Sequence, residues 1–221
     1  MPRGLSGSIA TTIHGRYLAD VPDREGPHPL VVGFHGYGET AETHLEQLRR
    51  LPRSSECVLV SVRALHLFYT KAGDVVGSWM TKLDRDEAVA DNAAYVAATV
   101  ARVKAEFPVD ARLAFVGFSQ GASMAYRAAA RAGHPCQAIL AIAGDMPPEV
   151  ASDDGIVWPP VLVTRGEQDR YFTEDKMARD VAHLRARGAE VEAVVFPGGH
   201  EWAEPVFAAA GSLLTRALRL P

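Results

Sequence analysis

Short, largely apolar runs alternate with longer segments of helical periodicity along most of this chain. The runs occupy residues 30–34, 57–62, 113–116, 138–142, 161–164 and 191–196. A strand that is apolar at consecutive positions is buried on both faces, as in a parallel sheet covered by helices. The pattern therefore predicts an α/β protein with a mostly parallel central sheet and helices on both faces.

Helices are predicted between these runs because apolar residues there recur every three or four positions. The clearest one spans 84–107, where Val89, Val96 and Val103 share one face and Pro108 ends the helix. The other helices are expected after a cap at Thr40, over 120–132, between a cap at Thr173 and a stop at Gly188, and from about Pro205 nearly to residue 221.

Two further segments bear on domain organisation. Residues 7–18 could add an antiparallel edge strand. The proline-rich stretch 145–160 is expected to be a loop, which is too short to hold a helical cap domain. Because the alternating pattern continues to the end, residues 1–221 are expected to form one domain.

Composition and charge exclude several kinds of partner. Hydrophobic residues make up 48% of the 221 residues, and the formal net charge is −4 with the charges scattered. No basic stripe favours nucleic acid or an anionic membrane. No apolar run approaches the roughly 18 residues that suggest a membrane span, and residues 1–7 lack the apolar core of a secretory signal.

Cysteine usage points to a cytoplasmic protein. Cys57 and Cys136 adjoin apolar runs, and two cysteines are too few for a disulfide framework. Both are expected to be small core residues. No cluster of cysteine and histidine has the spacing of zinc ligands, so no metal and no cofactor are expected.

The sequence Gly117-Phe118-Ser119-Gln120-Gly121 fits the G-x-S-x-G pattern between a predicted strand and a predicted helix. That context is typical of a nucleophile elbow, in which a tight turn raises the serine hydroxyl above the sheet. Side chains two residues before and after the serine would clash in such a turn. The N-terminus of the following helix favours negative charge. Ser119 is therefore the predicted nucleophile.

A serine hydroxyl needs a general base, and the base needs an acid that orients it. After a nucleophile elbow the chain order is serine, acid, histidine. Of the histidines that follow Ser119, His200 comes after the last predicted strand in a glycine-flanked loop, where ligands sit in open α/β sheets. His134 is expected in a surface loop and His183 within a helix, so His200 is the predicted base.

Asp169 is the predicted acid, because it follows the predicted strand 161–164 and precedes His200 by 31 residues. This places it at the carboxyl end of a strand, beside the expected site. The alternatives are Glu167, Asp145, Asp153 and Asp154. Asp145 is interpreted as a loop residue that could support the site.

Attack by a serine on a carbonyl group also requires two N–H donors for the oxyanion of the tetrahedral intermediate. The residue after the nucleophile, Gln120, supplies one backbone N–H. The glycine-rich loop after the first core strand, His35-Gly36-Tyr37-Gly38, is expected to supply the other from Tyr37. His35 is interpreted as a hydrogen-bonding brace of this loop. A phosphate-binding loop is excluded because neither G-x-G-x-x-G nor a following Lys-Ser/Thr is present.

These motifs together resemble the α/β-hydrolase superfamily, and within it the small carboxylesterase/phospholipase group that includes acyl-protein thioesterases. The resemblance rests on residues 34–38, 117–121, 166–169 and 198–200. It implies a single α/β-hydrolase domain without a cap. Two segments depart from the group's pattern: Met80-Thr81 replaces an aromatic and an acid, and Ala122-Ser123 follows the elbow instead of a glycine.

The resemblance also bears on substrate contacts. Gly77-Ser78-Trp79 resembles the segment that lines the acyl site in such esterases, which makes Trp79 a candidate substrate contact or else a core residue. His35 and Gly36 are further candidate contacts.

The expected activity is hydrolysis of small or medium carboxylic esters through an acyl-enzyme, acting on a small-molecule substrate. A lysophospholipase or acyl-thioesterase with the same triad is an alternative. A perhydrolase or haloperoxidase would use the same residues, and a small-molecule receptor with little turnover would share the fold. Neither nucleic acid nor stable membrane insertion is expected, and the sequence does not determine the oligomeric state.

Overall fold

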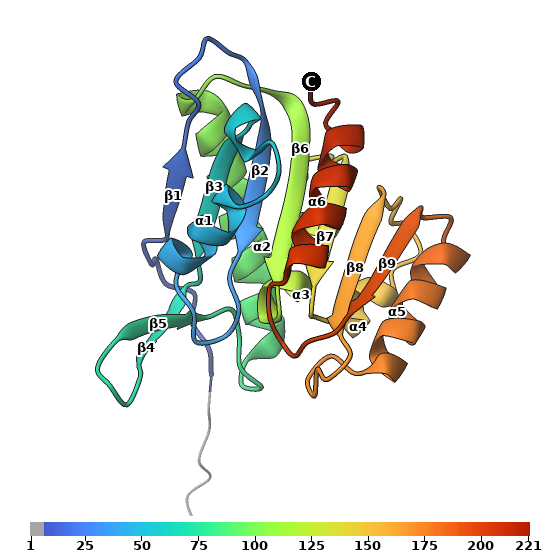
Figure 1. The fold of residues 1–221 in the computed structure, drawn as a ribbon. Helices are drawn as coiled ribbons and strands as arrows, with labels where there is room; N and C mark the ends of the chain where they lie inside the picture. The colour runs from blue at the N-terminus through green and yellow to red at the C-terminus, as the bar shows by residue number, and fades with distance from the viewer. Residues whose placement is uncertain (1–6) are drawn as a thin grey trace, which may run out of the picture.

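The computed structural model describes residues 7–221, which build a seven-stranded sheet in the order β1-β3-β2-β6-β7-β8-β9 and a separate β4-β5 hairpin (Figure 1). The strands are β1 (Arg16–Asp20), β2 (His28–Phe34), β3 (Val58–Arg63), β4 (His66–Tyr69), β5 (Val75–Ser78), β6 (Val109–Phe118), β7 (Ala138–Ile142), β8 (Val161–Gly166) and β9 (Val191–Phe196). The helices are α1 (Ala41–Arg49), the short 3-10 helix η1 (Ser54–Glu56), α2 (Arg85–Glu106), α3 (Gln120–Arg131), α4 (Pro148–Ala151), α5 (Glu174–Ala186) and α6 (Glu204–Ala217).

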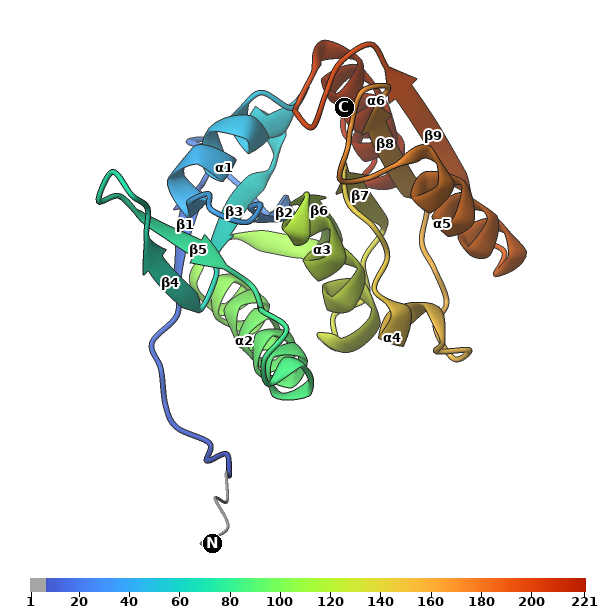
Figure 2. The same cartoon turned by 90° about the horizontal axis from the view of Figure 1, so that it is seen from below.

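Six strands of the large sheet run parallel, and β1 pairs antiparallel with β3 at one edge. Side chains of α1 and α6 pack against one face of the sheet. Those of α2, α3, α4 and α5 pack against the other, as Figure 2 shows from below. The predicted α/β architecture, with a mostly parallel sheet covered on both faces, is confirmed.

Several predicted segments need correction. An antiparallel edge strand is present, but it covers Arg16–Asp20 rather than 7–18, because only these residues pair with β3 while 7–15 lie exposed. The hairpin of β4 and β5 was not predicted. The stretch 145–160 is not wholly a loop, since it contains the four-residue helix α4. It holds no cap domain.

Most of the other predicted elements agree with the structure to within a few residues. Thr40 caps α1 in a capping box with Thr43, as expected of a helix that begins there. Cys57 is buried and Cys136 is partly buried, and both are free thiols packed against the core. Among the described residues, no helix is long and apolar enough to cross a membrane.

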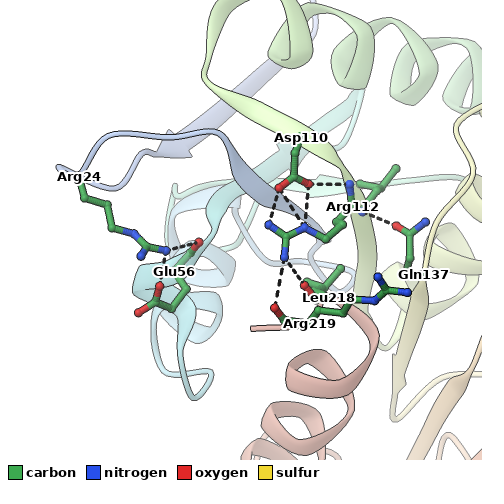
Figure 3. Close-up of polar contacts among 8 residues, drawn as sticks. Arg24, Glu56, Asp110, Arg112, Gln137, Leu218 and Arg219 are labelled. Carbon is green, nitrogen blue, oxygen red and sulfur yellow. Dashed lines mark hydrogen bonds and ion pairs between the residues drawn. The ribbon is translucent and has the colours of Figure 1, made fainter. Parts of the chain in front are cut away.

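A polar cluster fastens the end of α6 to the amino-terminal half of β6 (Figure 3). Arg112 binds the carboxylate of Asp110 and donates to the carbonyl of Leu218 at 2.6 Å. Beside it, the side-chain oxygen of Gln137 accepts the N–H of Leu113 at 2.6 Å. The carboxyl ends of the parallel strands lie at the opposite edge of the sheet, where the loops that follow them contain the predicted site residues.

Candidate active site

Ser119 occupies a strained turn between β6 and α3. Its φ of 54° and ψ of −119° lie outside the regions that non-glycine residues prefer, and its N–H donates to the carbonyl of Ile142 at 2.8 Å. A Cβ at Gly117 would lie 2.0 Å from the carbonyl oxygen of Gly121, and one at Gly121 would lie 1.9 Å from that of Phe34. Both glycines of the motif are therefore required by close backbone contacts.

The side chains of Ser119, His200 and Asp169 form a hydrogen-bonded chain. Oγ of Ser119 lies 2.8 Å from Nε2 of His200, and Nδ1 of His200 lies 2.8 Å from Oδ2 of Asp169. The other carboxylate oxygen accepts the N–H groups of Tyr171 and Phe172 at 2.8 and 3.0 Å. Both contacts of His200 are satisfied when Nδ1–H donates a hydrogen bond to the aspartate and Nε2 accepts one from the serine hydroxyl.

Aromatic rings on two sides fix the orientation of the His200 imidazole. Its centroid lies 5.1 Å from that of Phe118 and 5.0 Å from that of Tyr171. Phe118 in turn packs against Trp202 at 6.0 Å. Sequence reasoning missed these rings, although each lies within two residues of a predicted site residue.

Two backbone N–H groups point to an oxyanion hole. In the part of the chain that the structure describes, neither the N–H of Tyr37 nor that of Gln120 donates to a protein acceptor. The loop around Tyr37 is nevertheless held firmly, because Gly38 donates to the carbonyl of Gly77 and Gly77 donates to that of Glu39, each at 2.9 Å. Free donors on an anchored backbone suit the stabilisation of a transient anion.

The side chain of His35 braces the same loop from beneath. Nδ1 donates to the carbonyl of Gly36 at 2.7 Å, and Nε2 accepts the N–H of Ala64 at 3.1 Å. Burial lowers the pKa of His35, which favours the neutral form that these two contacts require. On the other side, the Glu39 carboxylate accepts the N–H of Gly36 at 2.7 Å, and burial raises the pKa of Glu39.

Trp79 connects the loop to the elbow. Its indole Nε1–H donates to the carbonyl of His35 at 2.8 Å, and its backbone N–H donates to the side-chain oxygen of Gln120 at 2.8 Å. The Gln120 amide also donates to the carbonyl of Met80 at 3.0 Å. The side chains of Trp79 and His35 have no exposed surface. Of the two roles weighed for Trp79, the structure supports the core role, and His35 likewise serves as support rather than as a surface contact.

Among the described residues, none of the alternatives to the predicted acid and base forms a hydrogen bond with Ser119 or His200. Asp145 pairs with Lys176 at 3.4 Å, Asp154 pairs with Arg187, Asp153 accepts the N–H of Gly155, and Glu167 is exposed. His134 contacts the carbonyl of Ala97, and His183 lies on α5. Within residues 7–221, no group of three or more His, Cys, Asp or Glu side chains is arranged to hold a metal ion.

Ser119 and His200 line an open cleft of about 500 Å³. Its remaining lining residues are Gln120, Ser123, Ala143, Gly144, Asp145, Arg170, Tyr171, Phe172 and Lys176. A smaller hollow of about 230 Å³ adjoins it and shares Gln120, Ser123 and Asp145. The nucleophile is therefore reached directly from the surface.

A family model described as phospholipase/carboxylesterase matches residues 19–215. The chain belongs to this family. The family and its fold are therefore as the sequence motifs predicted: a small α/β hydrolase of the carboxylesterase type. No curated protein sequence matches the chain significantly.

Solved structures show the same fold at low sequence identity. Esterase PE8 is 23% identical, with a TM-score of 0.77 over 93% of this chain and 100% of that one. Acyl-protein thioesterase 2 of Zea mays is 21% identical, with a TM-score of 0.70 over 93% and 100%. A phospholipase/carboxylesterase of Dyadobacter fermentans is 22% identical, with a TM-score of 0.71 over 91% and 97%.

Proposed function

We propose that this protein is a serine esterase that cleaves carboxylic esters through an acyl-enzyme intermediate. The observation that carries the proposal is the chain of two 2.8 Å contacts from Ser119 through His200 to Asp169. The N–H groups of Tyr37 and Gln120, which have no acceptor among the described residues, support it. Membership in a family of ester hydrolases gives the reaction class.

Acylation would begin as Oγ of Ser119 attacks the ester carbonyl carbon and Nε2 of His200 takes the hydroxyl proton. Asp169 stabilises the imidazolium, and the N–H groups of Tyr37 and Gln120 stabilise the oxyanion. When the intermediate collapses, the carbon–oxygen bond to the leaving group breaks. His200 then protonates the departing alcohol, which leaves Ser119 acylated.

Deacylation would repeat these roles with water. His200 takes a proton from the water molecule whose oxygen attacks the acyl carbonyl. Collapse of the second tetrahedral intermediate breaks the bond to Oγ, and the imidazolium returns the proton to Ser119. The products are the carboxylic acid and the free enzyme.

The open cleft favours small or medium acyl esters, because no cap between β7 and β8 encloses a long chain. Lysophospholipids and acyl thioesters are the alternative substrates of the same triad. A series of p-nitrophenyl esters from about two to about sixteen carbons should show its highest kcat/KM at short or medium chains. A maximum at long chains would contradict the open-cleft argument and favour the lipid or thioester substrates.

Replacement of Ser119 by alanine tests the mechanism. We expect a folded variant whose kcat falls by roughly 10⁴-fold or more and which no longer reacts with a fluorophosphonate probe. Ser212→Ala, an exposed serine on α6, is the matched control and should retain both properties. Slow labelling of the native protein and no turnover on ester and thioester panels would instead indicate a small-molecule receptor.

A further inference from the structure

The walls of the cleft carry more positive than negative charge. Arg170 and Lys176 line the larger part beside Ser119, and Arg85 and Arg127 line the adjoining hollow. The one carboxylate that lines either part is Asp145. This sign is opposite to that of the whole chain, whose formal net charge is −4. A positive cleft in an acidic protein therefore needs its own explanation.

The ion pairs in the cleft do not neutralise these cations. Arg127 and Arg85 share the single carboxylate of Glu149, at 2.7 and 3.2 Å. Lys176 pairs with Asp145 at 3.4 Å. Four cationic side chains thus meet two carboxylates, which leaves an excess of two positive charges. The surplus is distributed over both parts of the cleft.

Arg170 is the cation without a partner. In the part of the chain that the structure describes, its guanidinium neither forms an ion pair nor donates a hydrogen bond, and it is exposed. It stands between Asp169 and Tyr171, whose ring packs on His200, so its side chain begins next to the reacting groups. A free guanidinium binds planar anions such as carboxylates through two parallel hydrogen bonds.

The remaining carboxylates near the site do not line either part of the cleft. Asp169 is buried and is bound by His200 and two backbone N–H groups. Glu39 and Glu201 do not line either part of the cleft. Their carboxylates accept the N–H groups of Gly36 and Gly199, at 2.7 and 2.8 Å.

We propose that the preferred substrates are short esters whose non-reacting part carries a carboxylate or phosphate group. Arg170, with Lys176 beside it, would hold this anionic group while Ser119 attacks the ester carbonyl. The inference rests on the esterase function proposed above and adds the substrate class. A cleft with an excess of one sign raises the local concentration of substrates of the opposite sign.

Esters with and without an anionic group on the non-reacting part are compared to test this substrate class. On the acyl side, mono-p-nitrophenyl glutarate is compared with p-nitrophenyl pentanoate. On the leaving-group side, 4-acetoxybenzoate and 4-acetoxyphenyl phosphate are compared with 4-acetoxybenzamide. We expect at least one anionic ester to exceed its neutral counterpart by about tenfold in kcat/KM at low ionic strength. That ratio should shrink as salt screens the cleft.

The Arg170→Gln variant should reduce the anionic-to-neutral ratio by about tenfold, and Arg170→Lys should restore part of it. Arg102→Gln makes the same charge change on α2, where Arg102 pairs with Glu106, and should leave the ratio unaltered. The ratio reports charge recognition, so a general loss of activity does not imitate the effect.

The outcomes separate the two proposals. If neutral esters are hydrolysed but no anionic ester is preferred, the substrate class is wrong and the esterase function stands. If the preference survives in Arg170→Gln, Arg170 does not hold the anionic group and that part of the proposal is wrong. If no ester is cleaved and the fluorophosphonate does not label Ser119, both proposals fail.

Discussion

The indole N–H of Trp79 donates a 2.8 Å hydrogen bond to the carbonyl oxygen of His35 at the end of β2. The backbone N–H of the same tryptophan is held by the side chain of Gln120 at the start of α3. One buried residue at the end of the β4-β5 hairpin thus joins the two segments that carry the proposed oxyanion donors. It follows that the spacing of those donors depends on a residue that does not line the cleft.

Replacing Trp79 with phenylalanine should lower both stability and activity. The variant keeps an aromatic ring against Phe34 but removes the indole donor, which leaves the buried carbonyl of His35 unpaired. We expect a loss of about 1–3 kcal/mol in the free energy of unfolding and a kcat lower by roughly tenfold. Chemical denaturation and steady-state kinetics on one ester measure both. An unchanged kcat would show that this bond does not set the geometry of the loop.

Glu39 provides a second test of the loop. Its carboxylate accepts the N–H of Gly36, so Glu39→Ala frees that donor and loosens the segment that bears Tyr37. We expect kcat/KM to fall by about tenfold with KM little changed, because the loop acts on the transition state. Glu39→Gln keeps an oxygen acceptor, so its kcat/KM should fall by less. Equal losses in the two variants would point to the charge of Glu39 rather than to its hydrogen bond.

Strands could be predicted from the sequence where they are buried on both faces of the sheet, because such burial requires consecutive apolar residues. The strands at 138–142 and 191–196 were predicted with the bounds that the structure shows. The hairpin of β4 and β5 was not predicted because each strand has only four residues and β4 is mostly exposed, so no long apolar run marks it. The first residues of β6 were also not predicted, because 109–112 are only partly buried or exposed and form no apolar run.

The candidate site likewise contains residues that the sequence predicts and contacts that it does not. Ser119, Asp169 and His200 could be proposed because each follows a strand, and parallel strands end at one edge of the sheet. The brace formed by His35 could also be proposed, because His35 lies in the glycine-rich loop itself. Its link to Trp79 could not, because that link is a contact between distant segments. Trp79 and His35 are separated by 44 positions in the sequence, and only the folded hairpin brings them together.

Gly121 tests the close packing of the elbow. Helix propensity alone predicts that Gly121→Ala would stabilise α3 by about 1 kcal/mol. The structure predicts the opposite, because a Cβ would lie 1.9 Å from the carbonyl oxygen of Phe34, a backbone atom in the centre of the sheet. We expect the free energy of unfolding of Gly121→Ala to be lower by about 3 kcal/mol or more, or the variant to fail to fold. Gly155→Ala, whose new Cβ meets nothing closer than 3.4 Å, is the control for thermal denaturation.

His44 should make the stability of the protein depend on pH. It is fully buried, neither ring nitrogen has a hydrogen-bond partner among the described residues, and burial lowers its pKa to about 3. An unfolded histidine has a pKa of about 6.5, so between these values the unfolded state binds the extra proton. The contribution of neutral, buried His44 to the free energy of unfolding is therefore complete above about pH 6.5 and is lost as the pH falls toward 3.

For His44 alone, this difference amounts to about 2 kcal/mol between roughly pH 7.5 and pH 5. Urea denaturation at the two pH values should therefore show a smaller acid-induced loss in His44→Leu than in the native protein, by about that amount. The comparison concerns the slope with pH, so the packing change caused by leucine cancels. His66→Leu, an exposed position on β4, should retain the native slope. Identical slopes in His44→Leu and the native protein would mean that His44 finds a way to bind its proton in the folded state.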